Sequence, residues 1–163
     1  MNTIISGNVG FVHIIASVSA LIFGTLVLAM PKGSRIHRKI GYVYFVSMII
    51  VVVTAFLIYR LFGGFGVFHA AAIVSGFALA AGMLPVIFRR PRGSWLALHF
   101  NFMYWSVIGL YAAFAAETLV RMPGQKFFAA VGIATFIVFA AGNIAFLFYK
   151  KKWKTMVAAV EQN

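Results

Sequence analysis

Five long, almost uncharged runs restrict this sequence to one kind of fold. They cover residues 9–30, 40–62, 67–88, 95–116 and 127–149. Each run is close to the roughly 20 apolar residues with which a helix crosses about 30 Å of hydrocarbon. Hydrocarbon offers no partners to backbone N–H and C=O groups, so such runs must be helical. We therefore predict an all-α integral membrane protein in which residues 1–163 form one transmembrane domain, a bundle of five helices.

The charged residues are concentrated in alternate connections between these runs. Of 14 Lys and Arg residues, four lie in 31–39, three in 89–94 and four in the tail from Lys150 to Lys154. The opposite face has only Arg60, Arg121 and Lys126. Positive residues prefer the cytoplasmic side, which predicts an external N-terminus and a cytoplasmic C-terminus. Topology thus explains the net charge of +12, and we expect the lipid bilayer, not nucleic acid, as partner.

Missing residue types exclude several kinds of chemistry. The chain has no Cys, no Asp and only two acidic residues, Glu117 and Glu161. Without thiolates there is no disulfide, iron–sulfur cluster or Cys-bound metal. Hydrolysis by paired carboxylates also lacks its residues. Imidazole is the remaining polar chemistry.

One histidine stands near the start of each of the first four runs. Because successive helices run in opposite directions, His13 and His69 are expected near the outer face, and His37 and His99 near the cytoplasmic face. The segments "FVHIIASVSALIFG" and "VFHAAAIVSGFALAAG" resemble each other, and each is followed by Pro, a basic residue, Gly, Ser and a second histidine. This internal repeat predicts a four-helix core built from two repeated hairpins.

Two facing imidazoles in a helix bundle are what bis-histidine haem ligation requires. The histidine pattern therefore predicts two b-type haems, one per leaflet. Arg35, Arg38 and Lys39 are candidates to meet the carboxylates of the inner haem. The same basic residues also have a topological role, and a lone interfacial histidine is as often structural as functional.

The segments "KGSRIHRKIG", "FHAAAIVSG" and "HFNFMYWSVIGLYAAFAAETLVRMP" resemble a family of bacterial predicted membrane proteins, domain of unknown function 2306. The resemblance covers the first to the fourth helix and implies location in the bacterial inner membrane. The order of histidines is also similar to that of cytochrome b561-type di-haem proteins. That second resemblance implies that His13 and His69 hold one haem, that His37 and His99 hold the other, and that the protein is an oxidoreductase using a quinol or another small reductant.

Two other classes of function are compatible with the same residues. The four histidines are also candidate ligands of Zn²⁺ or Cu, although the expected topology divides them two and two, whereas such sites take three or four ligands. The other class is a small transporter or structural subunit without a cofactor. No pair of runs is interrupted at matching depths, as transporter sites require, and Pro85 is the main helix breaker.

The remaining polar and aromatic residues have structural interpretations. Glu117 and Arg121 are expected to form an i, i+4 ion pair, with Arg60 as a second partner. The fifth helix is expected to face lipid on one side, with close packing or a homodimer on the other. Interfacial anchoring is expected for Tyr42, Tyr44, Tyr104, Trp95 and Trp105. Interhelical hydrogen bonds are expected from Asn101, Asn143, Ser47, Ser75, Ser106 and Thr135.

Overall fold

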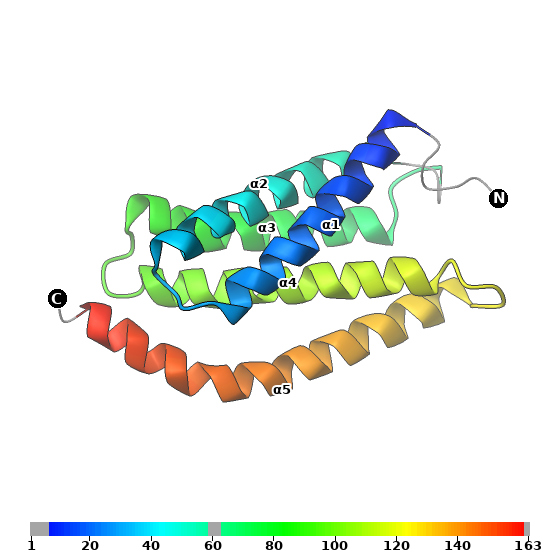
Figure 1. Ribbon diagram of the computed structural model, residues 1–163. Helices are drawn as coiled ribbons and strands as arrows, with labels where there is room; N and C mark the ends of the chain where they lie inside the picture. Colours follow the sequence, from blue (N-terminus) through cyan, green and yellow to red (C-terminus); the bar gives the residue numbers. More distant parts are fainter. Residues whose placement is uncertain (1–6, 59–62, 162–163) are drawn as a thin grey trace. The chain divides into compact units, whose positions relative to one another are not determined.

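The computed structural model describes residues 7–58 and 63–161, and these residues form five helices and no strand (Figure 1). The helices are α1 (Asn8–Ala29), α2 (Arg35–Ala55), α3 (Val67–Phe88), α4 (Trp95–Leu119) and α5 (Phe127–Glu161). Each is long and apolar enough to cross a membrane. The predicted all-α, five-span membrane protein is confirmed.

Two helices differ from their predicted bounds. The α2 helix begins at Arg35, ahead of the expected residue 40, because Ser34 caps it: the Ser34 hydroxyl accepts a hydrogen bond from the His37 backbone N–H at 3.0 Å. It also ends at Ala55, before the expected residue 62, and residues 59–62 lie outside the described part. The α5 helix continues beyond its span to Glu161.

The chain forms two compact units, residues 1–79 and 80–163. In the first unit, α1 packs against α2. The buried face of α1 includes the small residues Ala16, Ala20 and Gly24, spaced one helical turn apart. Small residues let helix backbones approach closely in a membrane, where the hydrophobic effect does not drive helices together.

The buried face of α2 is mostly polar. Its buried residues are His37, Tyr44, Ser47, Met48 and Thr54. Ser47 bonds the hydroxyl of Ser19 on α1 at 2.9 Å. This contact confirms the interhelical role expected for Ser47. Polar groups thus lie inside the first unit, while apolar side chains such as Val46 and Val53 are exposed.

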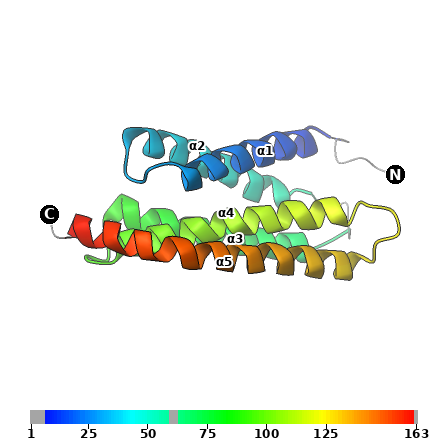
Figure 2. The same cartoon turned by 60° about the horizontal axis from the view of Figure 1, so that its bottom comes forward.

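In the second unit, α4 and α5 run antiparallel and side by side (Figures 1 and 2). The α5 helix buries Ala130 and Ala134, and it buries Gly142 further along the same face. The Tyr104 hydroxyl donates a hydrogen bond to the Gly142 carbonyl at 2.6 Å. The opposite side of α5 exposes Phe128, Phe136 and Phe148 by 74%, 74% and 78%, as expected for contact with lipid.

An aromatic cluster extends the contact between α4 and α5 beyond the span. Trp153 is 9% exposed. Its ring lies 5.4–5.9 Å, between centroids, from four other aromatic rings. These are the rings of Phe100, Tyr104, Phe146 and Tyr149. The cluster gives the C-terminal part of α5 an apolar surface to pack against.

Interfacial anchoring was the wrong expectation for two tyrosines. Tyr44 is 0% and Tyr104 is 3% exposed, whereas Tyr42 is 58% exposed. The hydrogen bond from Tyr104 to Gly142 explains how a phenol is accommodated inside. Asn101 and Asn143 also differ from expectation, since each amide donates to a carbonyl of its own helix, at Ala97 and Phe139.

Gly142→Ala is expected to destabilise the second unit. A Cβ at Gly142 would lie 2.8 Å from Ile108 Cγ2, so the two helices must separate or Ile108 must shift. Overpacking of this kind costs about 1–3 kcal/mol. Thermal unfolding in detergent measures the effect.

Gly132→Ala is the matched control, because Gly132 lies on the same helix and nothing is within 4 Å of its added Cβ. That variant should be as stable as wild type or more so, since Ala favours helix by about 1 kcal/mol over Gly. Equal melting temperatures for the two variants would contradict the close packing.

Candidate cofactor site

His99 on α4 has a fixed ring orientation. Its Nδ1 atom lies 2.9 Å from the carbonyl oxygen of Gly82 on α3. A carbonyl oxygen only accepts hydrogen bonds, so Nδ1 must carry the proton and Nε2 has the lone pair. A histidine that binds metal through Nε2 commonly donates Nδ1–H to a carbonyl or carboxylate in this way.

A glycine makes this hydrogen bond geometrically accessible. A Cβ built at Gly82 would lie 2.7 Å from Met103 Sδ and 3.3 Å from the Met103 backbone nitrogen. A side chain at this position would require the Met103 side chain to move and the Met103 backbone to shift slightly, so the glycine favours the close approach of α3 and α4. The close approach brings the Gly82 carbonyl within reach of His99, one turn before Met103 on α4.

His13 on α1 has a similar arrangement in the first unit. Its Nδ1 lies 2.8 Å from Thr54 Oγ1 on α2. The Thr54 hydroxyl also lies 2.6 Å from the Ile50 carbonyl and 3.1 Å from the Val51 carbonyl, either of which can accept its single proton. When the Thr54 proton is donated to a carbonyl of its own helix, Thr54 Oγ1 accepts from His13 Nδ1–H, and the lone pair of the neutral ring is on Nε2.

His69 is held in the opposite tautomer. It is the third residue of α3, and its Nδ1 accepts a hydrogen bond from the Gly66 backbone N–H at 3.1 Å. This is one half of a capping box at the start of the helix. A neutral ring whose Nδ1 accepts must carry its proton on Nε2. The ring also packs with Phe65 and Phe56, at centroid distances of 5.2 and 6.2 Å.

His37 is buried although its neighbours in sequence are charged. It is the third residue of α2 and is 9% exposed. Arg35, Arg38 and Lys39 are all exposed. The charged turn therefore does not draw this imidazole into water. Lys32 in the same turn donates to three carbonyls at the end of α1, those of Val27, Leu28 and Met30.

The internal repeat is preserved at the turns and is imperfect at the histidines. Gly33 and Gly93 have φ angles of 79° and 82°, and Ser34 and Ser94 follow as N-cap residues. His37 is the third residue of its helix, whereas His99 is the fifth residue of α4. Two residues correspond to about 3 Å along a helix and about 200° around it. The two histidines consequently occupy different faces of their helices.

The structure describes each predicted ligand separately. His13 and His69 belong to the first unit, while His37 belongs to the first and His99 to the second. Both pairings stay predictions. Among the described residues, no group of three or more His, Asp or Glu side chains is placed to hold a metal ion. The alternative of a Zn²⁺ or Cu site therefore finds no ligand cluster in that part of the chain.

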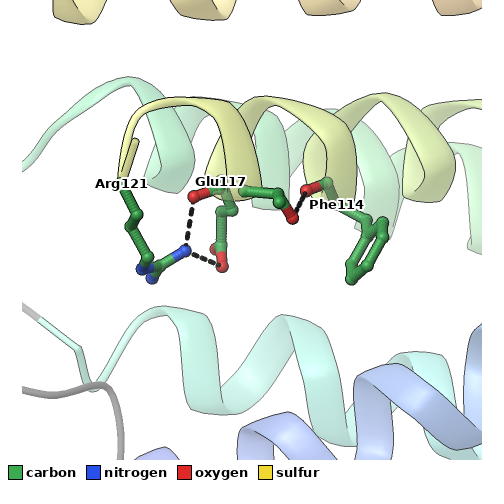
Figure 3. Close-up of polar contacts among 4 residues, drawn as sticks. Phe114, Glu117 and Arg121 are labelled. Carbon is green, nitrogen blue, oxygen red and sulfur yellow. Dashed lines mark hydrogen bonds and ion pairs between the residues drawn. The ribbon is translucent and has the colours of Figure 1, made fainter. Parts of the chain in front are cut away.

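Glu117 forms the expected ion pair on α4 (Figure 3). Arg121 Nη1 lies 3.3 Å from the Glu117 carboxylate and 2.6 Å from the Glu117 carbonyl. The side chains are 43% exposed for Arg121 and 33% for Glu117. Arg60, the other expected partner, lies outside the described residues. An i, i+4 pair with this exposure has a structural explanation and needs no catalytic one.

Gly82 and Thr54 are the residues that sequence reasoning missed. Each supplies the oxygen that orients a candidate ligand. Neither residue belongs to a recognisable sequence motif, because the carbonyl of any residue and the hydroxyl of any Thr can accept the same hydrogen bond. Only the packing of helices selects these two.

Gly82→Ala is expected to displace Met103 and with it the beginning of α4. The added Cβ should cost about 1–3 kcal/mol and break the bond between His99 and Gly82. Thermal unfolding reports the first effect, and ¹⁵N chemical shifts of the His99 ring report the change of tautomer. Gly76→Ala is the control on the same helix, because its Cβ would meet Val52 at an ordinary 3.5 Å. Unchanged His99 shifts in Gly82→Ala would refute the role of Gly82.

Comparison with known families agrees with the membrane architecture. The family model described as Predicted membrane protein (DUF2306) matches residues 10–149. No curated protein and no solved structure matches the chain. The matched segment contains all four histidines and the spans of all five helices apart from the first residues of α1 and the last of α5. This chain belongs to the DUF2306 family of predicted membrane proteins.

Proposed function

We propose that this protein transfers electrons across a membrane through b-type haem held by its histidines. The observation that carries the proposal is the oxygen atom that lies beside Nδ1 in His13 and in His99. In both rings Nδ1 faces an oxygen that accepts its proton, at 2.8 and 2.9 Å. The lone pair is then on Nε2, the atom through which imidazole binds haem iron.

The groups around these two rings favour ligation. When bound, haem would supply one-electron redox chemistry at its iron. The Gly82 carbonyl and the Thr54 hydroxyl would fix the planes of His99 and His13 and raise the basicity of their Nε2 atoms. Arg35, Arg38 and Lys39 are exposed at the start of α2 and are candidates to neutralise haem carboxylates.

His69 fits a ligand role less well than His13 does. Ligation through Nε2 requires the proton to move to Nδ1, and that tautomer cannot accept the Gly66 hydrogen bond. We therefore assign His13 and His99 as the main ligands. His69 and His37 are assigned as the second ligands of the outer and inner haem. Binding of the outer haem must then release the cap of α3.

The proposal extends to location and electron donor. The predicted topology puts the protein in the bacterial inner membrane with its N-terminus outside. Two haems at different depths would connect donors on one side with acceptors on the other, and an apolar reductant such as a quinol would reach the protein through the bilayer. The proposed homodimer would use α5, whose span is the least buried of the five.

Substituting either of the two histidines that share a haem should have the same effect on haem content. His13→Ala and His69→Ala are expected to lose the same haem, because each removes one axial ligand of a shared iron, and the double variant should be little worse than either. His37→Ala and His99→Ala should share a second phenotype. Reduced-state absorption and haem content of purified variants measure these effects. The pairing would be wrong if His13→Ala matched His37→Ala while His69→Ala stayed normal.

Thr54 offers a conservative control within the same experiment. Thr54→Val keeps the shape of the side chain and removes the acceptor for His13, whereas Thr54→Ser retains the hydroxyl. Loss of the group that hydrogen-bonds a metal-binding histidine typically lowers metal affinity by about 10–100-fold. We expect that loss for the outer haem in Thr54→Val and near-normal content in Thr54→Ser. Equal content in both would exclude an orienting role for Thr54.

A further inference from the structure

A groove opens at the end of α3 in the second unit, with a volume of about 710 Å³. Its lining is apolar apart from one arginine. It consists of Ala81, Leu84, Pro85, Phe88, Leu98, Phe102 and Arg90. Leu84 and Phe88 are 49% and 66% exposed, so the groove is open along the outside of a membrane-spanning helix. An acyl chain has the shape and polarity for such a surface.

The backbone after α3 holds Arg90 at the end of this groove. The Arg90 N–H donates to the Pro85 carbonyl at 3.2 Å, and Arg89 between them has a φ of 50°. This is the six-to-one bond of a Schellman motif, in which glycine normally occupies the left-handed position. A residue with a Cβ pays about 1–2 kcal/mol for that conformation. The strained turn returns Arg90 toward the groove.

The positive charge of Arg90 has no carboxylate partner within the described side chains. The chain has two acidic residues against 14 Lys and Arg. The one ion pair among the described residues joins Glu117 to Arg121. Ser94, the N-cap of α4, makes no side-chain hydrogen bond to the first turn, so the positive end of this helix adds to the charge of the turn. Among the described side chains no carboxylate neutralises Arg90, so this arginine is available to an anion from outside the chain.

We propose that this groove binds an anionic phospholipid, with one acyl chain along the apolar wall and the phosphate at Arg90. Arg89 and Arg92 are exposed in the same turn but do not line the groove, so Arg90 is the basic residue placed at the phosphate. A neutral ligand such as a quinone would fill the apolar wall and leave the arginine without compensation. The proposal does not depend on haem.

The test compares phosphatidylglycerol with phosphatidylcholine of the same acyl chains, titrated onto the detergent-purified full chain and counted by native mass spectrometry. Wild type should prefer phosphatidylglycerol. Arg90→Gln should weaken phosphatidylglycerol binding about fivefold, the effect of one basic residue near anionic lipid, and leave phosphatidylcholine binding unchanged. Arg92→Gln is the matched control, because it removes the same charge from the same turn outside the groove lining. The Arg92→Gln variant should still bind phosphatidylglycerol more tightly than phosphatidylcholine.

Ala81→Leu tests the apolar wall by filling it and should reduce binding of both lipids. Circular dichroism verifies that each variant is folded, and Arg90, being exposed, gives a variant that is not limited by folding. If Arg90→Gln and Arg92→Gln lost phosphatidylglycerol binding equally, the lipid would be attracted by the basic turn as a whole and not by a specific site. That result would overturn the proposal. Normal lipid binding in Ala81→Leu would also overturn it, as would a bound quinone with no preference for phosphatidylglycerol.

Discussion

Close packing of helices on small residues is the constraint on which the rest of this structure depends. Lipid tails are as apolar as leucine, so burying apolar side chains gains little, and contact between backbones must hold the helices together. In each of the two packed pairs, α1 with α2 and α4 with α5, one helix has a buried face of small residues. These are Ala16, Ala20 and Gly24 on α1 and Ala130, Ala134 and Gly142 on α5. The facing helices place their polar and aromatic groups against these surfaces. The same principle applies at Gly82, where α3 approaches α4.

This packing determines the chemistry of the histidines, because helices that approach closely bring carbonyl and hydroxyl oxygens within reach of imidazole nitrogens. His99 meets a carbonyl, and His13 meets a hydroxyl that can donate its own proton to the Ile50 carbonyl. Both rings then have the tautomer of a metal ligand. His69 meets a backbone N–H instead and has the tautomer of a helix cap. The hydrogen-bond partner of each ring thus distinguishes histidines that share the same sequence pattern.

The sequence was sufficient to predict the features that depend on composition and local spacing. The five spans follow from uncharged runs, and the Glu117–Arg121 pair follows from i, i+4 spacing. Burial of Tyr44 and Tyr104 could not be predicted, because an aromatic phenol suits an interface and an interior equally well until its partner is known. For Tyr104 that partner is a carbonyl 38 residues away.

The candidate site was predictable in its residue types and not in its geometry. Four histidines at helix starts indicated imidazole chemistry, yet the oxygen atoms that orient two of them come from Gly82 and Thr54, 17 and 41 residues distant in sequence. The early start of α2 at Arg35 was missed for a local reason, since Ser34 is a capping residue placed within a run of charges that resembled a loop. The surrounding charged residues made an ordinary helix N-terminus look like a loop.

The central claim is that imidazoles of this chain bind haem iron, and an absorption spectrum tests it most directly. The protein would be purified in detergent from haem-replete cells and recorded after oxidation and again after reduction with dithionite. Sharp bands of low-spin b-type haem are expected in the reduced state, because two imidazoles would hold each iron. A colourless protein that remains folded, with all five helices intact by circular dichroism, would contradict it.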